Sequence, residues 1–303
     1  MRVCREPSPR CARPSSPSPQ PRCGGHEQRR SRVVPMTQLS IQDGLLPGGT
    51  IAERFANARR LGFDAIELAS QPIMEHARDA IREGVTVSAI CSGHRGWLID
   101  PDPEQVRAAR ADIRELLELG AQLDAPLILV PIYGRTRHLP NCGTGRSAAD
   151  DESLFMDGLL EASAHAERVG ATIALEAINR YENSVCVTLA DARRLRNALG
   201  SPAVRVMGDV FHMNIEEADL GAALRACGDA LGYVHLADSQ RLEPGKGHLD
   251  LAPVFAALAE VGYRGYASME CHLSGPAEEV LPAAVSHLRG LIAAAAAAEV
   301  PGA

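Results

Sequence analysis

Four residues that can bind a divalent cation each stand at or just beyond the end of a short apolar run. They are Glu176, Asp209, His235 and Glu270, and their runs are ATIALE, VRVMGD, LGYVH and YASME. The intervals between them are 33, 26 and 35 residues, and each leaves room for a crossover helix between parallel strands. Because the carboxyl ends of parallel strands converge at the mouth of a barrel, these distant positions could share one ion.

The donor types indicate which ions would bind. Two Glu, one Asp and one His with open positions suit Mn²⁺, Mg²⁺ or Co²⁺ better than a soft, thiolate-bound metal, and Zn²⁺ is also compatible. An acidic group that ends an apolar strand is costly unless it is paired or metal-bound. Taken singly, each residue also has a structural explanation: Asp209 could cap the segment that follows it, and His235 could be a satisfied core histidine. The joint pattern predicts one divalent metal site, with Mn²⁺ preferred.

Short apolar runs alternate with amphipathic stretches from residue 37 to about 290, which is the pattern of repeated βα units. We expect strands near 37–42, 64–68, 85–91, 127–131, 171–175, 204–209, 231–236 and 265–270. We expect helices near 50–61, 72–82, 102–124, 150–169, 188–198, 215–228, 251–261 and 276–298. A chain of 303 residues accommodates one (β/α)₈ TIM barrel, for which about 250 residues is usual. We therefore predict this fold for residues 36–303.

Two connections are longer than the barrel requires. Residues 91–101 and 132–149 follow the third and fourth expected strands, on the face where loops carry function in such barrels. We expect them to cover a substrate. Trp97, the only Trp, could form an apolar wall for a sugar ring or simply pack on the rim, and His94, Arg135 and His138 are weaker candidates for substrate contact.

The first 35 residues differ from the rest of the chain. They hold eight Arg, two Glu and seven of the 20 Pro, with no apolar stretch from which to build a core. We expect residues 1–35 to be a disordered Arg/Pro/Ser-rich extension that the barrel does not need. The extension lacks the apolar segment of a secretory signal, and its prolines oppose a transit-peptide helix, so a cytoplasmic location is expected.

The charge of the remaining chain limits the partners that we expect, and its cysteines indicate the state of the thiols. Without the extension the net charge is −13, and an acidic body repels phosphate backbones, so no nucleic-acid partner is expected. No run of 18 apolar residues predicts a membrane span. The cysteines are scattered without a CxxC pair, as expected of free thiols. The oligomeric state is left open, and a homo-oligomer is compatible with the sequence.

Several motifs give the chain a family resemblance. From Thr37 to about Arg289 it resembles the xylose-isomerase-like TIM barrels, and within them the sugar isomerase/epimerase group of ketose 3-epimerases and hydroxypyruvate isomerases. The motifs are ALEAINRYEN (174–183), GDVFHMNIEE (208–217), YVHLADSQRLEPGKGHLDL (233–251) and GYRGYASMEC (262–271). The resemblance implies an enzyme of carbohydrate metabolism that isomerises or epimerises a ketose, or a related hydroxy-carbonyl sugar, by proton transfer through an enediolate.

The resemblance also implies roles for particular residues. Glu176, Asp209, His235 and Glu270 would bind the catalytic metal, and Glu176 and Glu270 would face each other across the substrate as the acid/base pair. Glu182, His212 and Arg241 match positions that contact substrate. Each of these three could instead lie in a solvated loop.

Other functions fit parts of the same pattern. A keto-inositol-type dehydratase would share the barrel and the metal but would expel water after proton abstraction. An endonuclease IV-like nuclease needs three metals with extra histidines after strands three and four, where this chain has CSG (91–93) and PIYG (131–134). A non-catalytic sugar-binding barrel would bind metal and sugar without turnover.

Overall fold

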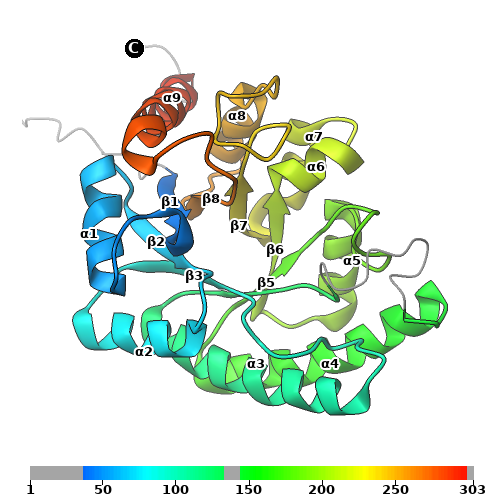
Figure 1. Cartoon of the computed structure of the whole chain (residues 1–303). Coiled ribbons are helices and arrows are strands. Elements are labelled where there is room, and N and C mark those ends of the chain that lie inside the picture. The colour runs from blue at the N-terminus through cyan, green and yellow to red at the C-terminus, as the bar shows by residue number, and fades with distance from the viewer. Residues whose placement is uncertain (1–36, 133–143, 299–303) are drawn as a thin grey trace, which may run out of the picture. The chain divides into compact units, whose positions relative to one another are not determined.

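Eight parallel strands form the closed barrel that the sequence predicts. In the computed structural model, which describes residues 37–132 and 144–298, the strands pair in sequence order and β8 closes on β1 (Figure 1). The strands are β1 (Gln38–Gln42), β2 (Ala65–Leu68), β3 (Val87–Cys91), β4 (Leu127–Leu129), β5 (Ile173–Glu176), β6 (Val204–Asp209), β7 (Leu231–Leu236) and β8 (Tyr266–Met269). Strand order and closure confirm the (β/α)₈ TIM barrel.

Helices follow the strands and surround the barrel. They are α1 (Ile51–Leu61), α2 (Ile73–Glu83), α3 (Pro103–Leu123), α4 (Ala148–Val169), α5 (Leu189–Leu199), α6 (Val210–Glu216), α7 (Leu220–Cys227), α8 (Ala252–Glu260) and α9 (Ala277–Ala298). Local chemistry defines several ends: Thr50 and Thr188 open α1 and α5 with capping boxes, and a left-handed Gly200 closes α5.

The predicted helix 215–228 is wrong at its start. The structure has two helices there, α6 and α7, separated at residues 217–219. Asp209 caps the first and Asp219 caps the second through backbone amides of their first turns. Asp219, a second N-cap residue inside the apolar pattern, therefore starts α7 later than predicted, and most of α6 lies before the predicted range.

The hydrophobic core lies mainly between the barrel and its helices. Inward-facing strand residues form a smaller group, which includes Ala89, Ile128, Ala174, Met207 and Tyr233. The barrel interior is therefore not purely aliphatic, because Tyr233 brings a hydroxyl into it.

By length and composition alone, helix α9 could span a membrane. A single helix of this kind is weak evidence of a span, because core helices of soluble proteins pass the same test. Its residues Leu281, Ala284, Val285, Leu288 and Ile292 are buried in the main core, and the helix contacts α1 and α8 (Figure 1). This is the pattern of a helix that covers a barrel. The predicted extension, residues 1–35, lies outside the described residues.

Candidate metal centre and active site

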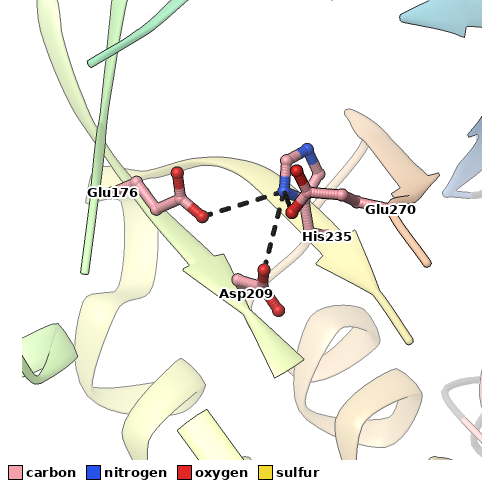
Figure 2. Close-up of side chains that lie close together, drawn as sticks. All are labelled: Glu176, Asp209, His235 and Glu270. Atoms are coloured by element: carbon pink, nitrogen blue, oxygen red, sulfur yellow. Dashed lines mark ion pairs between the residues drawn. The ribbon is translucent and has the colours of Figure 1, made fainter. Parts of the chain in front are cut away.

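The four predicted ligands meet at the carboxyl ends of four successive strands. Glu176 and Asp209 end β5 and β6, His235 is the penultimate residue of β7, and Glu270 directly follows β8. One ligand atom from each lies within 4.8 Å of the others. His235 Nδ1 lies 3.8 Å from both Glu176 Oε1 and Asp209 Oδ2 and 3.1 Å from Glu270 Oε2 (Figure 2). Four residues that are far apart in sequence thus form a single cluster in space.

Asp209 has both of the roles that the sequence offered as alternatives. Its Oδ1 accepts hydrogen bonds from the backbone amides of Phe211 at 2.7 Å and His212 at 3.4 Å, which caps α6. Its Oδ2 faces His235 and the other ligands. One carboxylate therefore starts a helix and contributes to the cluster, so the two readings are not exclusive.

Two buried atoms, which form ion pairs but no hydrogen bonds, test whether the cluster fits a metal. Asp209 Oδ2 and His235 Nδ1 are buried and have no hydrogen-bond partner among residues 37–132 and 144–298. Both face the centre of the cluster, where leaving buried polar atoms without a hydrogen bond is costly. Three carboxylates and one imidazole are a suitable donor set for a divalent cation. The residues present therefore fit such an ion.

The pKa directions show how strongly the groups affect one another. Burial raises the pKa of Glu176 well above its usual value. Burial alone would also raise the pKa of Asp209, but His212 and Arg241 outweigh it and hold that pKa low. For His235, burial is opposed by Glu67 and Glu270, which raise its pKa. Close charges of both signs are crowded into a site shielded from water.

Arg241 lies directly against the cluster. Its Nη2 donates to Glu270 Oε2 at 2.5 Å, and its Nη1 lies 3.5 Å from Asp209 Oδ2. Its guanidinium carbon stacks 4.6 Å from the centre of the Phe211 ring. Ring and carboxylates together fix the orientation of the guanidinium.

His212 and Glu182 add two further polar side chains to the site. His212 is buried, its Nε2 lies 3.6 Å from Asp209 Oδ2, and its Nδ1 accepts a 2.7 Å hydrogen bond from the amide of Asn179. The same Asn179 amide donates to Glu182 Oε1 at 3.1 Å. The structure thus connects both predicted substrate contacts to the site, and Asn179 is a member of it that the sequence analysis missed.

The loop that carries Arg241 is fixed by a buried carboxylate. Asp238 accepts backbone hydrogen bonds from Ser239 at 2.7 Å, Gly245 at 2.9 Å and Leu249 at 3.1 Å. Burial would raise the pKa of Asp238, but these amides and that of Gly247 lower it. A Cβ at Gly247 would collide with the Asp238 carboxylate. The turn leaves Arg241 at φ 60°, a backbone conformation that non-glycine residues rarely adopt.

The loops after β7 and β8 are also joined to each other. Leu242 forms a β-bridge with His272, whose amide donates to Arg241 O at 2.6 Å. Buried Glu243 accepts the backbone amide of Ser274 at 2.9 Å and its hydroxyl at 2.5 Å. The position of Arg241 therefore depends on both loops.

The remaining candidates lie in the loops after β3 and β4. Trp97 is half-buried, packs against the main core and makes an edge contact with His94, with ring centres 5.1 Å apart. This contact agrees with packing on the rim, and no described contact joins Trp97 to the four ligands. Arg135 and His138 lie outside the described residues.

Glu67 is the main residue that sequence analysis missed. It is fully buried in β2, and its carboxylate lies 2.9 and 3.0 Å from His235 Nε2. The available signal was weaker than for the metal ligands, because Glu67 is an acidic residue inside the apolar run GFDAIELA and not at its end.

Comparisons with known proteins place this site in a family. Residues 55–291 match the model of the xylose isomerase-like TIM barrel. The chain belongs to this family. The match covers all four cluster residues and confirms the resemblance drawn from the motifs.

Two sequence relatives and one solved structure are sugar epimerases. The chain is 36% identical over 226 residues to 3-dehydro-D-guloside 4-epimerase of Escherichia coli, covering 73% of this chain and 86% of the relative. It is 32% identical over 222 residues to D-psicose 3-epimerase of Enterocloster bolteae, covering 69% and 73%. The structure of an E. coli 3-keto-D-glucoside 4-epimerase aligns with a TM-score of 0.77 and 32% identity over 84% of this chain and 99% of that one. The chain is accordingly a sugar epimerase of the isomerase class with a metal-binding site.

Proposed function

We propose that the protein inverts the configuration of a carbon next to a ketone in a sugar. The names of the relatives support this: one acts at carbon 4 of a 3-dehydro sugar and the other at carbon 3 of psicose, a ketose. In both, the stereocentre adjoins a carbonyl, so its proton is weakly acidic. The observation that carries the proposal is the convergence of Glu176, Asp209, His235 and Glu270 on one point.

Glu176 and Glu270 would carry out the proton transfer. They reach the cluster from β5 and from the end of β8, so their carboxylates approach it from different sides (Figure 2). One would remove the proton from the sugar carbon, and the other would return a proton to the opposite face. A divalent ion, when bound, would polarise the ketone and stabilise the negative charge that develops on its oxygen.

Arg241 and His212 would hold the sugar in place for this transfer. Arg241 offers guanidinium N–H donors to ketone or hydroxyl oxygens, and Phe211 restricts the movement of that guanidinium. His212 accepts from Asn179 through Nδ1, and its Nε2 faces the site beside Asp209 Oδ2 and Arg241 Nη1. Fixed donors of this kind lower the barrier by positioning the reacting atoms.

The metal is tested first. We propose one ion per chain, with Mn²⁺ preferred. Elemental analysis after Mn²⁺ loading should give one equivalent in the wild type and clearly less in Glu176→Gln and Asp209→Asn. Unaltered loading in both variants would contradict the site.

The reaction is tested by turnover in D₂O with free ketoses and 3-keto glycosides as separate substrates. An epimerase that exchanges protons through two carboxylates should place deuterium at the inverted carbon. A dehydratase would give a product lighter by one water, and a binding barrel would give no product. Complete retention of protium in an epimerised product would contradict exchange with solvent.

A further inference from the structure

A polar network behind the metal centre reaches it from two strands that contribute no ligand. Glu67 of β2 is fully buried, and both of its oxygens lie within 3.0 Å of His235 Nε2. Tyr233 donates its hydroxyl to Glu67 Oε2 at 2.8 Å, and Gln42 of β1 donates its amide to Glu67 Oε1 at 2.9 Å. Three donors, two from β7 and one from β1, thus converge on one carboxylate of β2.

This arrangement decides which nitrogen of His235 carries the proton. The Gln42 amide nitrogen can only donate to Oε1, and the Tyr233 hydroxyl donates to Oε2, so both Glu67 oxygens are acceptors. His235 Nε2 must therefore supply the proton to Glu67. Its Nδ1, the atom that faces Glu176, Asp209 and Glu270, is left with a free lone pair when the ring is neutral.

The network also holds Glu270. The Gln42 amide donates to Glu270 Oε1 at 2.9 Å as well as to Glu67, using both of its hydrogens. Gln42 and Glu67 are register partners in neighbouring strands, which fixes the spacing of this bridge. Two of the four ligands are therefore oriented from β1 and β2.

A chain of hydroxyl groups inside the barrel extends from the Glu67 carboxylate. Tyr233 contacts Ser88 Oγ at 2.7 Å, and Ser88 contacts Ser40 Oγ at 2.6 Å. All three residues are buried. A buried carboxylate is stable only when its oxygens are paired, and this set of contacts pairs them while preventing rotation of the group.

We propose that Glu67 is a positioning residue that holds His235 in the Nε2–H tautomer and aims Nδ1 at the metal, while Gln42 extends the same control to Glu270. The proposal rests on the metal site of the proposed function but is independent of the sugar. Outer contacts of metal-binding histidines typically change metal affinity by about 10–100-fold.

The first test uses the wild-type protein loaded with Zn²⁺, which is diamagnetic. Long-range ¹H–¹⁵N spectra of its histidine rings, with His235 assigned by comparison with a His235→Gln variant, should show a protonated Nε2 and a metal-shifted Nδ1. A protonated Nδ1 would overturn the proposal without the use of any Glu67 variant.

The second test measures Mn²⁺ binding by calorimetry in Glu67→Gln. We expect the dissociation constant to rise by about 10–100-fold, with the thermal midpoint of unfolding measured in parallel. Ser40→Ala is the matched control, because it alters the far end of the same network and leaves the Glu67 contacts intact; its affinity should stay within about threefold.

The outcomes separate this inference from the proposed function. If the wild type binds no metal, the metal site itself is wrong. If the wild type binds Mn²⁺ and Glu67→Gln binds it equally well, only the positioning role is wrong. If Glu67→Gln fails to fold, Tyr233→Phe takes its place: it removes one donor to Glu67 and should weaken Mn²⁺ binding, and unchanged affinity there would overturn the proposal.

Discussion

The two ends of the barrel differ in what they offer a ligand. At the amino ends of the strands a cavity of about 570 Å³ opens among the turns that precede β4 to β8, and several glycines line it. At the carboxyl ends the four cluster residues, Arg241 and His212 crowd around one point. This cavity lies at the end of the barrel opposite the four cluster residues.

The charged groups at the two ends differ in their exposure to water. Asp124, Asp229 and Arg264 beside the cavity are exposed, and Arg205 is half-buried, so water solvates them. At the mouth, Asp209, His235 and Glu67 are buried; His235 and Glu67 pair across the barrel, and backbone amides of α6 hold Asp209. Function follows buried, oriented groups, because only these are preorganised before substrate arrives.

The largest expected effect is at the mouth. Glu270→Gln should lower turnover by about 10²–10⁴-fold, because a positioned acid or base is lost. Steady-state kinetics on the best sugar substrate measure it. Asp229→Asn, beside the cavity at the other end, is the control; equal losses in both variants would erase the distinction between the two ends.

A smaller loss is expected for Arg241→Ala. Removing its charge-assisted contacts to substrate should cost about 1.5–3 kcal/mol in kcat/KM. Metal content should change little, since Arg241 is not a ligand. An unaltered kcat/KM would mean that the guanidinium only balances the charge of Glu270.

Asp238→Asn tests the loop that carries Arg241. Losing a carboxylate that accepts several backbone amides should cost about 1–3 kcal/mol of unfolding free energy at pH 7. The pKa of Asp238 is lowered in the folded state, so its contribution is complete above the unfolded pKa of about 3.9 and disappears as pH falls through the folded value. Denaturant titrations should therefore show the gap between wild type and variant shrinking below about pH 4. A gap that is constant with pH would assign the loss to packing.

The smallest effect is expected for Arg264→Ala. Arg264 is exposed and donates only to the carbonyl of neighbouring Tyr263 among the described contacts. Stability should stay within about 0.5 kcal/mol of the wild type, and kcat/KM should be unchanged. A clear fall in kcat/KM would show that the cavity communicates with the mouth.

The sequence predicted the barrel and the ligand cluster for the same physical reason. Apolar runs repeat at βα spacing, and residues such as Asp209 and Glu270 stand where those runs stop. Glu67 was missed because its run continues through Leu68, so nothing separates it from a strand residue until its partner His235 is known. Cross-barrel contacts of this kind have no periodicity along the chain.

Helix α6 and the orientation of Arg241 were not predicted, because each depends on contacts that the sequence pattern does not show. Helix α6 was not predicted because the capping role of Asp209 was weighed against metal binding, whereas its two oxygens divide the tasks. The orientation of Arg241 also could not be read from the chain. It requires a left-handed residue other than glycine, and Asp238 and His272, which secure that turn, lie in two different loops.

The bridge between Leu242 and His272, with Glu243 bound to Ser274, has a consequence for how such enzymes diversify. Two neighbouring loops that share backbone and carboxylate contacts cannot be exchanged one at a time without disturbing the guanidinium between them. Grafting the loop after β8 from another epimerase should therefore preserve the position of Arg241 only if residues 238–249 come with it. The unit that must vary as a whole at this side of the barrel is therefore the pair of loops.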